Sequence, residues 1–179
     1  MKKIVNELLI ISFVVYILIF IWIVYFKCNV ESWINLTIDL FKEMAIKDKI
    51  IYGLIPFQGS SIMEIRSNIY NVIIFIPLPI FIKTIFEKLN YFKLTIICLT
   101  VTTIIEFSQL FIPYCAYATE DIICNFIGGV IGILFFKYLL NNNSNYEIKL
   151  TLIMFVLFLL PVFVFAIINT ISSLEIYKI

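Results

Sequence analysis

The chain has no histidine, and only 14% of its 179 residues are charged. Without histidine it cannot build a Ser-His-Asp triad, a Cys-His pair or a histidine-ligated metal site. The four cysteines show no CxxC spacing, so we expect neither a metal nor a cofactor. The net charge of +1 argues against a nucleic-acid partner, because phosphate binding needs clustered lysine and arginine.

Hydrophobic residues are abundant: they make up 63% of the chain, and the mean hydropathy is +1.07. A soluble domain is about half apolar and a quarter charged, so most side chains here must face lipid. The long runs are apolar on every side, whereas strands of a membrane β-barrel alternate polar and apolar residues. The sequence therefore predicts an all-α integral membrane bundle of about five transmembrane helices. We expect residues 1–179 to form a single domain.

Five apolar runs are the expected spans, at about 8–26, 69–82, 94–112, 122–140 and 150–171. The first is longer than a signal-peptide core of about 7 to 15 residues and has no cleavage site after it, so it is interpreted as an N-terminal anchor. The second contains Pro77 and Pro79, which should kink it. In the fourth, Gly128 and Gly132 form a small-xxx-small pair that lets two helix backbones approach closely.

The segment between the first two spans has a different character. Apolar residues recur every three or four positions from Glu31 to Lys49, at Trp33, Leu36, Leu40 and Met44. This spacing predicts an amphipathic helix, either lying on the membrane surface or packed against the bundle. Gly53, Pro56 and Gly59 then indicate a loop or re-entrant turn.

Basic residues in the short loops predict the orientation in a bacterial cytoplasmic membrane. The loops after the second and fourth spans carry lysines, as does the N-terminus, and the loop after the third span carries none. The positive-inside rule then places the N-terminus in the cytoplasm. Basic residues in the first outer loop oppose this assignment: Lys27, Lys42, Lys47, Lys49 and Arg66.

With this topology, the polar residues of the spans fall in one layer near the outer face. They are Arg66, Asn68, Asn71, Glu106, Gln109, Glu120, Asp121 and Asn125, and all of these except Asn68 and Glu120 are candidate ligand-binding residues. The Glu106–Gln109 and Asp121–Asn125 pairs each lie on one helical face, and the two faces can meet around Arg66. A buried carboxylate costs several kcal/mol unless it is paired or protonated. Glu106 should therefore meet Arg66 or an amide, or be protonated.

Two interpretations of this layer remain open. In the first, it is a ligand or reaction site, with Glu106 and Asp121 as candidate acid and base, although no nucleophile accompanies them. In the second, it consists of polar contacts between helices, worth about 0.6 to 2 kcal/mol each.

Four short motifs in this order resemble the VanZ-like family of bacterial membrane proteins. They are Ile55-Pro56-Phe57, Asn71-Val-Ile-Ile-Phe75-Ile-Pro77, Glu106-Phe-Ser-Gln109 and Asp121-Ile-Ile-Cys-Asn125-Phe-Ile-Gly128. The resemblance covers about residues 50–136. The chain departs from the family pattern where Cys115 replaces an arginine, Ala118 and Glu120 replace two aspartates, and Pro79 replaces a glycine. Arg66 would then have to supply the positive charge alone.

The resemblance implies a role in the cell envelope, with low-level resistance to teicoplanin-type glycopeptide and lipoglycopeptide antibiotics. Our first hypothesis is that an outward polar pocket engages a lipoglycopeptide or a lipid-linked cell-wall precursor, with membrane lipids around it. The alternatives are a membrane-embedded enzyme that modifies a lipid or cell-wall precursor, and a purely structural helix interface. A transporter ranks last, because few polar residues reach the inner half of the spans.

Overall fold

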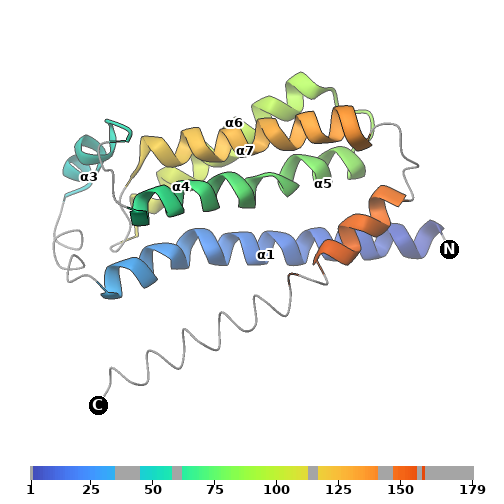
Figure 1. Cartoon of the computed structure of the whole chain (residues 1–179), viewed down its shortest axis with the longest axis horizontal. Coiled ribbons are helices and arrows are strands. Elements are labelled where there is room, and N and C mark those ends of the chain that lie inside the picture. The colour runs from blue at the N-terminus through green and yellow to red at the C-terminus, as the bar shows by residue number, and fades with distance from the viewer. Residues whose placement is uncertain are drawn as a thin grey trace, which may run out of the picture. The chain divides into compact units, whose positions relative to one another are not determined.

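A computed structural model of the chain describes residues 2–34, 45–57, 62–112, 117–140, 147–156 and 159. The described residues form helices joined by turns and contain no strand, which confirms the all-α prediction. The helices are α1 (Lys2–Ile34), α3 (Ile46–Gly53), α4 (Ile62–Phe75), α5 (Pro77–Ile85), α6 (Tyr91–Gln109) and α7 (Thr119–Phe135), followed by the π-helical turn η1 (Phe136–Leu140) (Figure 1). A further helix covers residues 147–156.

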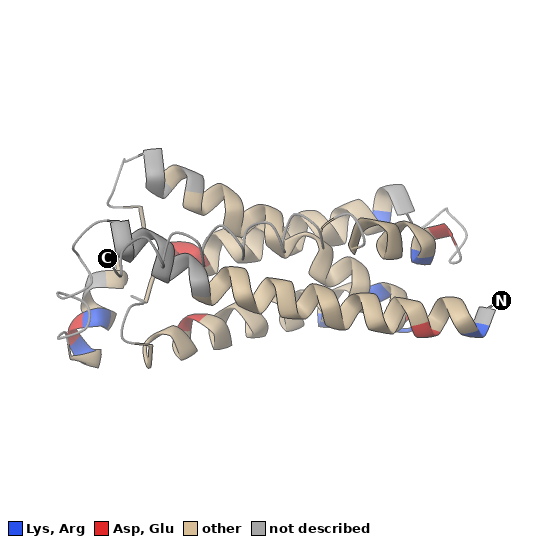
Figure 2. Cartoon of the chain, turned by 90° about the horizontal axis from the view of Figure 1, so that it is seen from below, with Lys and Arg blue, Asp and Glu red and all other residues tan. Residues whose placement is uncertain are grey.

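Four stretches of the described chain are long and apolar enough to cross a membrane. They are Lys3–Tyr25, Ser67–Ile85, Tyr91–Gln109 and Thr119–Tyr138. In Figure 2 the charged residues lie mostly toward the helix ends, and the stretches between them carry almost none. The molecule is thus a multi-pass helical membrane protein. Of the fifth predicted span, 150–171, only the helical part up to 156 and residue 159 lie within the described residues.

The chain divides into two compact units. One contains Met1–Val24 and Asn143–Ile179, and in it Lys149 Nζ donates to Asn6 Oδ1 at 2.8 Å, joining the 147–156 helix to α1. The other contains Tyr25–Asn142, and here α7 packs against α4, α5 and α6. All four sequence motifs lie in this second unit.

Glycines let α7 approach its neighbours closely. A Cβ on Gly128 would lie 2.2 Å from the carbonyl oxygen of Val72, and one on Gly132 would lie 2.2 Å from that of Ile76. Neither position tolerates a side chain without movement of the backbone, which confirms the predicted close packing of this pair. A Cβ on Gly129 would lie 3.0 Å from Cys98 Cβ, so the same turn of α7 also packs against α6.

The second span is interrupted at Ile76, between α4 and α5, directly before the first of its two prolines. Pro77 has no N–H for the carbonyl of Ile73, and the N–H of Ile76 donates to that carbonyl instead, at 3.3 Å. Pro77 then opens α5, a position where the missing N–H leaves no helical bond unmade.

The ends of the next two helices differ from the prediction. Helix α6 begins three residues early, because Asn90 caps it by accepting the N–H of Lys93 at 2.8 Å. It ends at Gln109, three residues early, since Pro113 disfavours helical backbone before it and would clash with the carbonyl of Gln109. Helix α7 begins at Thr119 rather than at 122, which places two acidic residues in a first turn where the helix dipole favours them.

The predicted amphipathic helix from Glu31 to Lys49 is wrong as one continuous element. Helix α1 runs past the expected end of the first span to Ile34, Ala45 has extended backbone (φ −64°, ψ 150°), and α3 starts at Ile46. Its part at 35–44 lies outside the described residues. The position of α3 is determined by its tertiary contacts. The expected loop is described as far as Phe57, through a turn that follows α3.

Candidate functional site

Polar side chains of α6 and residues of α7 meet at successive helical turns. One turn from the contact between Cys98 and Gly129, toward the start of α7, Asn125 Nδ2 donates to Thr102 Oγ1 at 3.1 Å. One further turn along α6 lies Glu106, whose Oε2 accepts the backbone N–H of Ala118 at 3.2 Å. This register follows from the antiparallel course of two helices joined by a short connection, and it brings the predicted polar residues of both helices into one interface.

Glu106 is the most deeply buried acidic residue of this interface, with 1% of its surface exposed. The Gln109 amide pairs with the Glu106 carboxylate when its Nε2 faces that carboxylate, at 3.3 Å from Oε1 and 3.1 Å from Oε2. In that orientation Glu106 meets an amide, which is one of the predicted alternatives. The side chain of Arg66, the alternative partner on α4, lies outside the described side chains.

Helix α4 joins the same layer through Asn71. Its Nδ2 donates to Oδ1 of Asp121 at 2.5 Å, linking the middle of α4 to the first turn of α7. Asn71 is buried and Asp121 is half-buried. Five of the six predicted site residues, all except Arg66, therefore lie together where α4, α6 and α7 meet, a region we call the polar layer.

Two residues of this region were missed as site candidates. Thr102 stands in a run of apolar residues and threonines, and nothing in its spacing distinguishes it from Thr103, which bonds back to its own helix. Asn68 was recognised only as a polar residue at the start of the second span. Its Oδ1 is buried, as is Oδ1 of Asn125, and neither atom has a hydrogen-bond partner among the residues that the structure describes.

Helix α3 contacts the C-terminal end of α6 and the N-terminal end of α7. Lys49 is 4% exposed, and its Nζ donates to the carbonyl of Ile112 at 3.0 Å, just beyond the C-terminus of α6. Thr119 Oγ1 donates to the carbonyl of Gly53 at 2.8 Å. A Cβ on Gly53 would lie 1.6 Å from the backbone oxygen of Tyr117, so this contact requires glycine.

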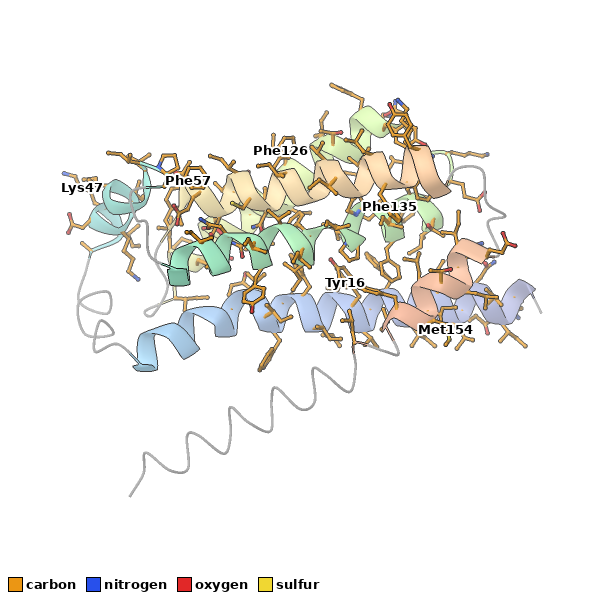
Figure 3. The ribbon with its side chains drawn as sticks, in the orientation of Figure 1. Tyr16, Lys47, Phe57, Phe126, Phe135 and Met154 are labelled. Atoms are coloured by element: carbon orange, nitrogen blue, oxygen red, sulfur yellow. The ribbon has the colours of Figure 1, made fainter. Side chains whose placement is uncertain are left out.

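The turn after α3 is held by α7 as well. The backbone N–H of Phe57 donates to Glu120 Oε2 at 2.7 Å, and Phe57 has a positive φ of 57°, a conformation that costs energy for a bulky residue. Figure 3 shows Phe57 beside the start of α7, with Lys47 on α3 nearby. Sequence reasoning did not separate buried Lys49 from exposed Lys47, because both lie among polar residues at similar spacing.

The chemistry available in the polar layer is that of hydrogen-bond acceptors. Two carboxylates and two amide oxygens lie in this layer, and the carboxylates accept from side-chain amides and from one backbone N–H. No group of three or more histidine, cysteine or acidic residues that could hold a metal ion occurs among the described residues.

Fold and site together define a multi-pass helical membrane protein with polar groups buried among three of its helices. A family model described as VanZ/LLP1 matches residues 13–141, which include α3 to α7. The chain therefore belongs to the VanZ/LLP1 family, as its motifs predicted. No curated protein and no solved structure matches the chain.

The departures from the family pattern can now be placed. Ala118 is the N-cap residue of α7 and provides no side-chain cap, while its backbone N–H binds Glu106. Glu120 holds the turn at Phe57. Cys115 lies outside the described residues, and Pro79 packs near Gly132.

Proposed function

We propose that this protein acts at the outer face of the bacterial cytoplasmic membrane, where its polar layer engages a lipid-linked cell-wall precursor or a lipoglycopeptide. This contact would reduce susceptibility to antibiotics of the teicoplanin type. The observation that carries the proposal is the burial of the Glu106 carboxylate, one turn from the end of α6, where it accepts the backbone N–H of Ala118. Membership of the VanZ/LLP1 family supports the envelope role.

An ionisable side chain buried within a span favours a ligand role over a purely structural interface. A glutamine at 106 would keep hydrogen bonds to Gln109 and to the backbone N–H of Ala118, without the several kcal/mol that a charge buried in a membrane costs. Asp121 likewise could be asparagine and still accept from Asn71. Ionisable residues within a span are functional-site candidates by default, and two of them meet in one layer here.

The proposal requires an orientation with the N-terminus in the cytoplasm and the α6–α7 connection outside. A variant that keeps only Cys115 should react with a membrane-impermeant maleimide on intact cells. Lys88→Cys, in the connection between α5 and α6 of a chain without other cysteines, should react only after the cells are opened. The reverse pattern would place the polar layer at the inner face and overturn the proposal.

The function itself is tested by expressing the protein in a susceptible host and titrating teicoplanin. The unmodified chain should raise the inhibitory concentration, and Glu106→Gln should abolish the increase while remaining folded in the membrane. Glu87→Gln, at an exposed residue near the other end of α6, is the matched control and should keep full resistance. An unchanged inhibitory concentration with confirmed membrane expression would refute the resistance role. Loss of the Glu106→Gln protein itself would favour the structural interpretation.

A further inference from the structure

Two buried amide oxygens in the polar layer lack a hydrogen-bond partner among the described residues: Oδ1 of Asn68 and Oδ1 of Asn125. Asn125 is 2% exposed, and its amide makes one bond, from Nδ2 to Thr102. An unsatisfied buried acceptor costs about 1 to 3 kcal/mol. A bound ligand that supplies the missing hydrogen-bond donors would explain these two buried oxygens.

The two oxygens lie at the same level of the interface between α4 and α7. Gly128 packs on the carbonyl of Val72, which fixes how these helices are aligned. Asn125 comes one turn before Gly128, and Asn68 comes one turn before Val72, so both lie one turn outward from the same contact. Because Nδ2 of Asn125 points to α6, its oxygen is turned away from Thr102. The Asn71–Asp121 hydrogen bond crosses the interface in the same layer.

These two oxygens need a hydrogen-bond donor. Amide oxygens only accept, and so do ionised carboxylates such as those of Glu106 and Asp121. A phosphate would bring further acceptors and negative charge into this layer. The carboxylates, which would attract an ammonium group, already accept from Gln109, Ala118 and Asn71. The atoms left over are neutral, and they match neutral hydroxyl groups.

We infer that the polar layer recognises the hydroxyl groups of a sugar headgroup on a membrane lipid, with Asn68 and Asn125 as the accepting residues. This rests on the proposed function, because it assigns the ligand chemistry of the same site. A carbohydrate ring places neighbouring hydroxyls so that two donors can reach two acceptors at one level. The apolar exterior of the spans keeps the lipid chains of such a ligand in the bilayer. One buried water could also bridge two such oxygens, so water is the competing occupant.

The test uses the full chain in phosphatidylcholine nanodiscs that contain equal mole fractions of monoglucosyl diacylglycerol, phosphatidylethanolamine or phosphatidic acid. Lipid retained on the protein is measured by native mass spectrometry. We expect preferential retention of the glucosyl lipid. Asn125→Leu and Asn68→Leu should each reduce it about fivefold, the effect of losing one hydrogen bond.

The matched control is Thr84→Val, which removes a buried hydroxyl of α5 that bonds only within its own helix, to Ile80. It should leave retention unchanged. Thermal unfolding of every variant is measured, and Asn68→Leu, at a half-buried residue, keeps the test valid if Asn125→Leu fails to fold. Equal retention of the glucosyl lipid by the unmodified chain and both leucine variants overturns the inference in favour of water. Preference for phosphatidylethanolamine overturns it in favour of an ammonium ligand.

The same experiment separates this inference from the proposed function. If the protein raises the teicoplanin concentration required for inhibition but retains no glucosyl lipid, the sugar assignment fails and the resistance role stands. If it retains the lipid through Asn125 but leaves teicoplanin susceptibility unchanged, the resistance role fails and the sugar assignment stands.

Discussion

The backbone N–H of Ala118, at the start of α7, donates to Oε2 of Glu106 in the last turn of α6, across 3.2 Å. This bond joins the two helices directly at the buried carboxylate. It also makes residue 118 sensitive to charge, because any acidic side chain placed there lies beside Glu106. The family pattern has aspartate at this position, so the alanine of this chain changes both the helix cap and the local electrostatics.

Ala118→Ser should stabilise the protein by about 0.5 to 1 kcal/mol. Ala118 has the extended backbone of an N-cap (φ −137°, ψ 111°) but no side-chain acceptor for the first N–H groups of α7, and serine supplies one. Thermal unfolding in detergent measures the gain.

Ala118→Asp should gain less than Ala118→Ser, since its carboxylate caps the helix but repels Glu106. In a Glu106→Gln background this deficit should disappear, which a double-mutant cycle would measure. Equal stabilisation by serine and aspartate with Glu106 intact would show that the two side chains do not interact.

Gly128→Ala should destabilise the protein by about 1 to 3 kcal/mol or more, because the added methyl group meets the Val72 carbonyl, which belongs to the backbone. Gly129→Ala should cost less, because the atoms it meets belong to the Cys98 side chain. Adding Cys98→Ala removes the Sγ contact at 3.2 Å but keeps the Cβ contact at 3.0 Å, so it should recover only part of the Gly129→Ala loss. Unfolding in a denaturing detergent compares these variants, and a Gly128→Ala protein as stable as the parent would contradict the close helix contact.

Lys49→Met should loosen α3, while Lys47→Met should not. Methionine keeps the apolar stem of the lysine but loses the hydrogen bond from Nζ to the Ile112 carbonyl, whereas Lys47 is exposed. We expect amide hydrogen exchange over residues 46–53 to become about tenfold faster in the Lys49 variant. Equal exchange in the two variants would mean that this bond does not hold α3 in place.

Glu120→Ala should release the turn at Phe57, and Glu120→Gln should largely preserve it. Glutamine retains an oxygen that can accept the Phe57 N–H, and alanine does not. Exchange of the Phe57 amide proton reports this bond directly and should accelerate only in the alanine variant. Phe57→Gly in the Glu120→Ala background should restore part of the lost stability, because glycine adopts the positive φ of this residue without strain.

Much of the polar layer could be predicted from the sequence. The spacing of Glu106 with Gln109 and of Asp121 with Asn125 assigns each pair to one helical face, and a buried acid in lipid must find a partner. The family motifs added the order in which the helices carry these groups. Neither argument could identify Thr102 as the partner of Asn125, because a threonine in an apolar helix is as often bonded to its own backbone, as Thr103 is.

The position of α3 could not be predicted from the sequence, for a related reason. Lys47 and Lys49 are two residues apart and have the same chemistry, yet Lys47 is exposed and Lys49 is buried, with 4% of its surface exposed. The difference arises from the C-terminal carbonyls of α6, which present an acceptor to one ammonium group only. Periodicity along a single helix carries no information about an acceptor supplied 63 residues later in the chain.

The amino-acid sequence by itself determined the membrane class, the all-helical fold, the break before Pro77 and the close approach permitted by Gly128 and Gly132. These follow from local rules: apolar length, missing N–H groups and missing side chains act wherever the segment lies. Only the tertiary structure decided that Glu106 binds Gln109 and the Ala118 backbone, and that two amide oxygens remain without donors among the described residues. The hydrogen bonds of a polar side chain depend on which atoms of other helices come within about 3 Å, and only the assembled bundle sets those distances.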